Sequence, residues 1–323
     1  MRDIKVDTLR GLACIFLVAY HVIGNNETNG LKISDGWLRD INDLLECVRM
    51  PLFTFLSGMV YALRPVNSNW LTFMKGKVRR LLVPMLVVGT FFALVQSFVP
   101  GTNNNIDNWW LIHIYPVQHF WFVEALFFVF VLVVPLELSK LLNKKAHIIA
   151  VICVFLLFSA GQPYTKLLAF KGFIYLTPFF LFGLYVVRFK LPSLPQLSSV
   201  CLFSVLMLAL FLSEGNVYGK GFLGCCIGLL SCYLLLCIKL QVPFLARIGI
   251  YSYSIYIFHV FFTAATRLIL GKLVSLPLEL SLLAGVTAGI VGPIVVHILA
   301  QKIPLASFFL LGQRIKRTEL NKG

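Results

Sequence analysis

The chain alternates between long continuous apolar runs and short polar segments. Ten runs approach the roughly 20 apolar residues that a helix needs to cross a bilayer. They cover residues 8–26, 45–64, 81–99, 118–137, 146–161, 170–188, 196–213, 221–238, 248–270 and 278–300. Because the apolar residues are continuous rather than alternating with polar ones, the pattern favours helices over the strands of a membrane barrel. It predicts an all-α polytopic membrane protein with about ten transmembrane helices.

The amino-acid composition also indicates a membrane protein. Of the 323 residues, 59% are hydrophobic and 13% are charged, whereas an average soluble domain has about 25% charged residues. These values exclude an ordinary soluble domain and a disordered chain. All cysteines except Cys47 lie well inside apolar runs, where cysteine acts as a small hydrophobe. Neither a disulfide framework nor a metal site is therefore predicted.

The formal net charge is +15, and the positions of the basic residues indicate what it means. Most Lys and Arg residues fall between apolar runs, in alternate segments. If the N-terminus is cytoplasmic and ten helices cross the bilayer, most of these cations are cytoplasmic, as the positive-inside rule requires. Both termini are then cytoplasmic, with a transmembrane domain over residues 1–300 and a basic cytoplasmic tail over 301–323. Basic residues do not interleave with stacking aromatics in any groove, so no nucleic-acid partner is predicted.

Arg10 and His21 are ionisable residues inside the first run, 11 residues apart. At about 100° and 1.5 Å per residue they share one helix face, about 16 Å apart along the axis. A permanent cation at the cytoplasmic mouth suits a phosphate, and a deep imidazole suits general-base catalysis. An extended coenzyme A arm has a length of this order. The alternative interpretation is a snorkelling arginine and a histidine that packs between helices.

A second cationic group precedes Pro84 at the third run. Lys77, Arg79 and Arg80 belong to it, and a run of this kind is most often a positive-inside anchor. Lys77 and Arg80, three residues apart, could instead hold nucleotide phosphates from one helix face. The chain has no glycine-rich phosphate loop, so side-chain cations would have to bind such a donor.

Further polar residues inside the runs are candidates because ionisable groups in a membrane are costly. Ser57 precedes a glycine, but without a G-x-S-x-G motif it is taken as a supporting residue. His119 and Trp121 open the fourth run, and Glu124 is a buried acid that needs a histidine or arginine partner. Ser252, Tyr256 and His259 follow i, i+4, i+7 spacing, which predicts one polar stripe facing the bundle interior.

Two outer loops, 24–44 and 100–117, are rich in Asn, Gly, Asp and Trp. Such side chains suit sugar hydroxyls and ring faces. They are also typical of loops and membrane interfaces, so carbohydrate contact is one of two interpretations.

Several of these segments together resemble a known family. Residues 6–13, followed by Tyr20 and His21, resemble the opening of the acyltransferase family 3 membrane proteins, which carry an Arg-x10-His pair in helix one. Ordered similarities continue at residues 51–58 (F-x-x-S-G), 77–84 (the basic entry to helix three), 119–122 (H-x-W-F), 177–183 (F-x-x-G) and 252–259 (S-Y-x-I-Y-x-x-H). Lys77 stands where the family frequently has its first arginine. Jointly the matches are specific, although each is modest alone.

The resemblance implies a multi-pass acyltransferase of the bacterial inner membrane. It would move an acetyl group from cytoplasmic acetyl-CoA, the acyl donor, to a hydroxyl of a surface carbohydrate or lipid-linked glycan. Arg10 and His21 would be catalytic, and Arg10, Lys77, Arg79 and Arg80 would bind the donor. Ser57, His119, Trp121, Glu124, Tyr256 and His259 would contact the acceptor or support the site. No metal is implied.

Some family members carry an additional C-terminal hydrolase-like domain of the SGNH type. This chain is expected to be a short stand-alone member without that domain, in contact with membrane lipid, and it could work with a separate extracytoplasmic transferase. Two alternatives remain from the sequence: a transporter or flippase of an anionic or lipid-linked glycan, and an acyltransferase acting on a small molecule. Buried Arg and His also mark transport pathways, although no inverted repeat is apparent.

Overall fold

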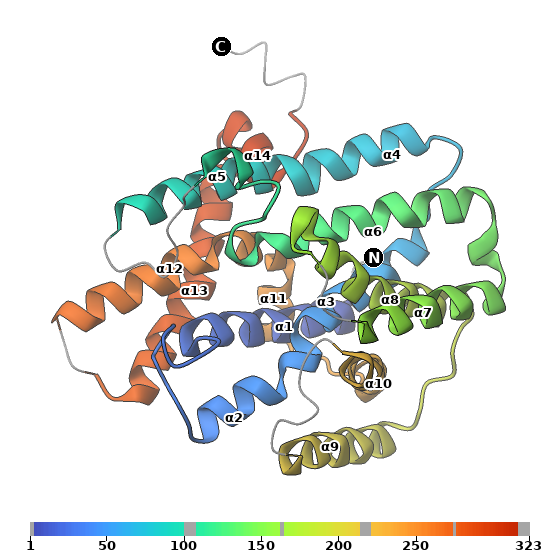
Figure 1. Cartoon of the computed structure of the whole chain (residues 1–323), viewed down its shortest axis with the longest axis horizontal. Coiled ribbons are helices and arrows are strands. Elements are labelled where there is room, and N and C mark those ends of the chain that lie inside the picture. Colours follow the sequence, from blue (N-terminus) through green and yellow to red (C-terminus); the bar gives the residue numbers. More distant parts are fainter. Residues whose placement is uncertain (1–2, 100–107, 162–164, 214–220, 274–275, 316–323) are drawn as a thin grey trace.

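The computed structural model describes residues 3–99, 108–161, 165–213, 221–273 and 276–315, which form helices and no strand (Figure 1). The long helices are α1 Ile4–Ile23, α3 Glu46–Leu63, α5 Val83–Phe98, α6 Trp121–Leu138, α7 Lys145–Ala160, α8 Phe170–Arg188, α9 Gln196–Leu212, α10 Phe222–Ile238, α12 Ser252–Leu273 and α13 Leu278–Ala300. The shorter ones are α2 Trp37–Leu44, α4 Trp70–Lys77, α11 Pro243–Ile250 and α14 Pro304–Leu311. A π-helical turn, Val78–Leu82, joins α4 to α5, and a 3₁₀ turn, Gln118–Phe120, leads into α6. The predicted all-α class is confirmed.

Seven helical segments among the described residues are long and apolar enough to cross a membrane. They are Ile4–Ile23, Trp37–Leu63, Trp70–Phe98, Gln118–Leu138, Leu167–Arg188, Ser252–Lys272 and Leu278–Ala300. Three apolar helices, α7, α9 and α10, are shorter, with 16 or 17 residues each. Every predicted run falls on one of these segments. The chain is thus a helical membrane protein, and the count of ten spans stays a prediction.

One predicted run is broken in the structure. The sequence predicts a single helix over 248–270, but α11 ends at Ile250 and α12 begins at Ser252. Tyr251 lies between them with φ −96° and ψ 10°, outside the helical region. The hydrophobic pattern does not reveal this turn, because the residues on both sides of it are apolar.

Two helix crossings are so close that only glycine fits at the contact. At the α1–α11 crossing, a Cβ on Gly11 would lie 1.9 Å from the Leu245 carbonyl oxygen, and one on Gly249 would lie 1.9 Å from that of Asp7. Small residues allow this backbone approach between membrane helices. Gly58, the glycine that follows Ser57, lies at the second crossing.

At the α3–α8 crossing the same reciprocal arrangement recurs. A Cβ on Gly58 would lie 1.9 Å from the Phe180 carbonyl oxygen, and one on Gly183 would lie 2.0 Å from that of Phe55. The two crossings together place four helices in backbone contact, in two pairs. One of the four is α1, which carries Arg10 and His21. The core of the bundle is therefore held by backbone surfaces as well as by side chains.

The bundle has two distinguishable ends. α1 lies in the middle of it, and α9 lies at its edge (Figure 1). Gly249, just before α12, packs on Asp7 near the start of α1, and His259 in α12 contacts His21 near the end of α1. The two helices therefore run in the same direction. We call the end that holds Asp7 the basic end, and the opposite one the histidine end.

Candidate active site

Three histidines from distant parts of the chain meet inside the bundle. His21 comes from the last turns of α1, His119 from the 3₁₀ turn before α6, and His259 from α12. The His21 ring centroid lies 4.7 Å from that of His259 and 5.8 Å from that of His119, and the latter two lie 5.0 Å apart. We call this group the histidine cluster. Among the described residues, no three potential ligands are arranged to hold a metal ion.

Backbone carbonyls determine which nitrogens of the cluster carry protons. His259 Nδ1 lies 2.8 Å from the carbonyl oxygens of both Ile255 and Tyr256, so it donates and its Nε2 keeps a lone pair. His119 Nε2 lies 3.3 Å from the Ile257 carbonyl oxygen, which leaves the lone pair on its Nδ1. Both lone-pair nitrogens are buried and have no hydrogen-bond partner among the described residues. The cluster therefore presents two proton acceptors beside His21.

Tyr256, three residues before His259 on α12, supports this arrangement. Its hydroxyl donates to the carbonyl oxygen of His119, and its ring centroid lies 5.5 Å from the His119 ring. The predicted polar stripe thus places Tyr256 and His259 on the interior face, and Tyr256 fixes the backbone that carries His119.

His21 also lines a cavity of about 990 Å³ at the histidine end, called the large cavity here. Its walls come from the end of α1 and the loop after it, from α5, and from α12 and the start of α13. Gln118 and Val260, the sequence neighbours of His119 and His259, line it as well. Of the three clustered histidines, His21 is the one that faces this space.

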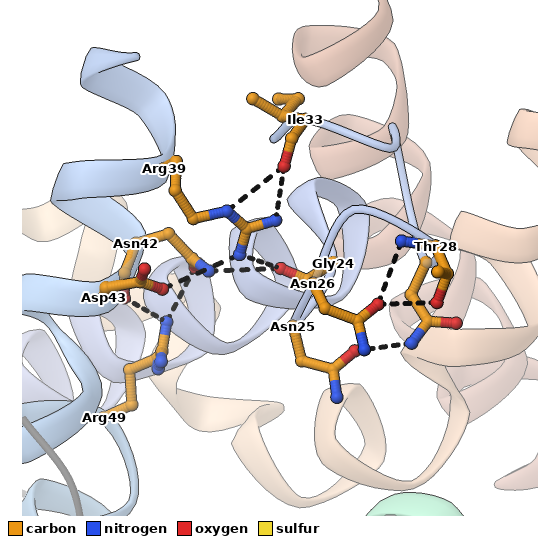
Figure 2. A network of polar contacts seen from close by, with 10 residues as sticks. Gly24, Asn25, Asn26, Thr28, Ile33, Arg39, Asn42, Asp43 and Arg49 are labelled. Atoms are coloured by element: carbon orange, nitrogen blue, oxygen red, sulfur yellow. Dashed lines mark hydrogen bonds and ion pairs between the residues drawn. The ribbon is translucent and has the colours of Figure 1, made fainter. Parts of the chain in front are cut away.

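The loop wall of the large cavity is held by two buried arginines (Figure 2). Arg39 donates to the Gly24 carbonyl oxygen at 2.8 Å and to that of Ile33 at 2.9 Å. Arg49 donates to the backbone and side-chain oxygens of Asn42, both at 2.8 Å, and its guanidinium lies 4.2 Å from the Tyr20 ring centroid. These bonds tie residues 24–33 to α2 and α3. The loop next to His21 is therefore anchored by hydrogen bonds from α2.

A second cavity, of about 710 Å³, lies at the basic end and is called the basic cavity. Among the described residues that line it, the charged ones are all cations: Lys77, Arg79, Arg80 and Arg314. Tyr253 of α12 also lines it, six residues before His259, which is a rise of about 9 Å along the helix. One helix thus leads from the basic cavity to the histidine cluster.

The π-helical turn shapes this basic cavity. Pro84 has no N–H to donate to the carbonyl four residues earlier, and the Val83 N–H bonds to the Val78 carbonyl five residues back. The wider turn presents Arg79 towards the C-terminal segment, where its Nε donates to the Gly312 carbonyl oxygen at 3.0 Å. π-turns inside α-helices are frequent at functional sites.

Lys77 is oriented by aromatic rings rather than by a carboxylate. Its ammonium lies 3.6 Å from the centroid of the Phe130 ring and 4.9 Å from that of Phe73, both at cation–π distance. Lys77 and Arg80, which were predicted to share one helix face, both line the basic cavity.

Arg10 occupies a different position from the other predicted donor-binding cations. It lies on α1 with His21, an unbroken helix as predicted, but it is not among the residues that line the basic cavity. Its guanidinium bonds to Asp7 one turn earlier, at 3.2 Å. The structure thus groups Lys77, Arg79 and Arg80 around the basic cavity and leaves Arg10 outside that group, paired with Asp7 on α1.

The remaining predicted residues lie around the cluster rather than in it. The Ser57 hydroxyl donates to the Phe53 carbonyl oxygen at 2.8 Å, within its own helix. Trp121 packs on Gly172 of α8, where a Cβ would lie 2.6 Å from its ring. Glu124 is buried, and its Oε2 has no hydrogen-bond partner among the described residues. The histidine or arginine partner expected for Glu124 is therefore not found there.

Two functional candidates escaped the sequence analysis. Arg314 lies in the segment predicted as a cytoplasmic tail, yet it lines the basic cavity next to Gly312. Arg267, near the end of the run 248–270, lines the large cavity. The sequence shows each as one cation among many at a segment end, so only tertiary packing distinguishes them.

Comparison with known proteins identifies the family of the chain. The family model described as an acyltransferase domain, that of acyltransferase family 3, matches residues 3–300. The chain belongs to this family, and it is therefore a membrane acyltransferase. No curated protein and no solved structure matches the chain.

Proposed function

We propose that the protein is an O-acetyltransferase that moves an acetyl group from cytoplasmic acetyl-CoA to a hydroxyl of a surface carbohydrate or lipid-linked glycan. The observation that carries the proposal is the position of His21. It touches two histidines with unshared lone pairs and faces the large cavity. Membership in an acyltransferase family favours this activity over the transport of a glycan.

The basic cavity is the proposed donor site. The described residues that line this cavity include four cations and no carboxylate. Such a set of side chains suits the phosphates of coenzyme A. The acetyl-bearing arm would extend along α12 from Tyr253 towards His259. Arg10, at the same end of α1, would add to the positive field around the donor without forming the wall of the cavity.

The proposed reaction is a direct transfer. His21 removes the proton from the acceptor hydroxyl, the oxygen attacks the thioester carbonyl carbon, and the carbon–sulfur bond breaks. The coenzyme A thiolate leaves and takes up the proton. A positioned base of this kind contributes about 10²- to 10⁴-fold to the rate. His119 and His259 act through His21, because their lone pairs can accept its N–H and hold its other nitrogen towards the hydroxyl.

Orientation in the bilayer follows from the charges and the chain ends. We propose that the basic end is cytoplasmic, because cations gather there. α14 and Gly312 pack against α5 and the π-turn, at the same end as the start of α1. If both chain ends lie on one side of the membrane, the number of spans is even. Seven spans would be an odd number, and adding the three shorter helices gives ten, which supports counting them. The large cavity would then face the outer side of a bacterial inner membrane.

The proposal is tested with the purified full chain in lipid nanodiscs. Labelled acetyl-CoA should release its coenzyme A thiol, and the label should appear as a base-labile ester on glycans extracted from the host's surface. A transporter would neither consume acetyl-CoA nor form an ester. Unchanged acetyl-CoA in the presence of the complete glycan extract would contradict the proposal.

His259 is expected to act as a positioning residue. In His259→Phe an aromatic ring remains but both ring nitrogens, and with them the Nε2 lone pair, are lost, so kcat should fall by about tenfold, less than the loss of a base itself. The KM for acetyl-CoA should not change, since the donor phosphates lie at the other end. His259→Gln, which keeps a donor and an acceptor, should recover part of kcat. A raised KM for acetyl-CoA with a normal kcat would show that His259 contributes to donor binding instead.

Arg314 is expected to help bind the donor. Arg314→Gln should raise the KM for acetyl-CoA by about fivefold, the effect of about 1 kcal/mol at an exposed cation, and kcat should stay constant. The matched control is Arg247→Gln, an exposed cation of α11 outside the basic cavity. Equal donor KM values for both variants would remove Arg314 from the site.

A further inference from the structure

We infer that the large cavity takes an acceptor with an anionic group, a carboxylate or a phosphate, and that the Arg267 guanidinium binds this group. The inference rests on the proposed acetyl transfer and specifies the class of its acceptor. Three observations carry it: the charges that line the cavity, the partners of Arg267, and its place relative to the histidine cluster.

The lining of the large cavity is positive. Arg267 and Lys32 are its permanently charged residues, and no Asp or Glu occurs among the described residues that line it. Apart from His21, its other polar side chains are neutral amides and hydroxyls. They are Asn25, Asn26, Thr28, Asn29, Gln96, Gln118, Thr263, Thr266 and Ser281, besides Tyr20. A concave surface with charges of one sign concentrates ligands of the opposite sign.

Arg267 differs from the other arginines at this end of the bundle. Arg39 and Arg49 are buried and engage several oxygens at close range, so they are structural. Arg267 makes one long hydrogen bond, 3.4 Å from its Nη1 to the Gly30 carbonyl oxygen, and no ion pair within the described residues. A cation in a membrane helix has a free-energy cost, so its presence there indicates a function. Its planar donors match a carboxylate or a phosphate.

Arg267 lies where it can orient an acceptor. It follows His259 on α12 by eight residues, about 12 Å along the helix, with Thr263 midway between them. Both Thr263 and Arg267 line the large cavity. The anionic group and the reacting hydroxyl therefore belong to different parts of the acceptor, which favours an acidic oligosaccharide or glycan chain over a single neutral sugar.

The test uses the glycan whose O-acetyl groups depend on this chain, de-esterified and prepared in three forms. One is intact, one has its carboxylates reduced to alcohols, and one has its phosphates removed. Initial rates of acetyl transfer are measured with the purified full chain in nanodiscs. Loss of the relevant anionic group should raise the acceptor KM by about ten- to a hundredfold, the usual effect of one charge-assisted hydrogen-bonded pair. The form that shows this increase distinguishes a carboxylate from a phosphate.

Variants then assign the effect to Arg267. Arg267→Gln should raise the KM for the intact glycan to the same extent and leave the KM for the neutralised glycan unchanged, while Arg267→Lys should retain part of the affinity. Lys272→Gln is the matched control, because Lys272 is an exposed cation on the same helix outside the large cavity. Its acceptor KM should equal that of the unmodified chain.

The outcomes separate this inference from the proposed function. A neutral native glycan, or equal acceptor KM values for the intact and neutralised forms, would overturn the anionic acceptor while leaving acetyl transfer intact. An equal KM for the intact glycan in the Arg267→Gln and Lys272→Gln variants would remove Arg267 from the site. The absence of transfer to every glycan form, with acetyl-CoA unconsumed, would overturn the proposed function itself.

Discussion

His21→Gln is expected to lose acetyl transfer by about 10²- to 10⁴-fold, the contribution of a positioned general base. His21 is the one member of the histidine cluster that faces the large cavity, so no neighbouring histidine can replace it at the acceptor hydroxyl. The lone pairs of His119 and His259 are buried behind it. Rates should be measured with saturating acetyl-CoA, so that the loss appears in kcat.

Two controls accompany this prediction. The donor KM of His21→Gln should be normal, since the basic cavity lies at the opposite end of α1. Its melting temperature in detergent should also be close to that of the unmodified chain, because the glutamine amide keeps an N–H donor for the lone pairs of His119 and His259. A variant that keeps full kcat would remove His21 as the base, even if the family assignment stands.

The glycine crossings should produce the largest stability effects. At Gly11, Gly249, Gly58 and Gly183 an added Cβ would lie within about 2 Å of a backbone carbonyl oxygen, which no side-chain rotation can relieve. Overpacking of a core typically costs about 1–3 kcal/mol, and here two helices must move apart. Gly58→Ala and Gly11→Ala should therefore lower the melting temperature sharply or prevent accumulation of folded protein.

Gly76→Ala and Gly271→Ala are the matched controls. Both glycines are helical, and an added Cβ would meet nothing within 4 Å. Alanine at such a position stabilises a helix by about 0.5–1 kcal/mol, so these variants should be as stable as the unmodified chain or slightly more stable. If Gly58→Ala behaves like Gly76→Ala in a thermal-shift assay, the close α3–α8 crossing is wrong.

The helices were predictable from the sequence because continuous apolar runs carry a strong and local signal. The break at Tyr251 was not, because a turn between two apolar segments leaves hydrophobicity unchanged. Pro84 was a visible signal for the irregular turn before α5, since a proline removes a backbone donor wherever it occurs. The bond from Arg10 to Asp7 was also foreseeable from their i, i+3 spacing.

The candidate site was predictable residue by residue but not as an arrangement. His21, His119 and His259 each stand out as ionisable residues in apolar runs, yet their contact depends on how α1, α6 and α12 pack. Arg267 and Arg314 look like ordinary helix-end cations in the sequence. Their roles arise only because the loop after α1 and the segment after α14 build cavity walls around them.

The central claim, acetyl transfer through His21, is tested most directly in the native host. The gene is deleted, and base-labile O-acetyl signals of the surface glycans are followed by proton NMR, with complementation by the intact chain and by His21→Gln. We expect an acetyl signal to disappear on deletion and to return with the intact chain alone. A glycan spectrum unchanged by the deletion, or a signal restored equally by His21→Gln, would contradict the account.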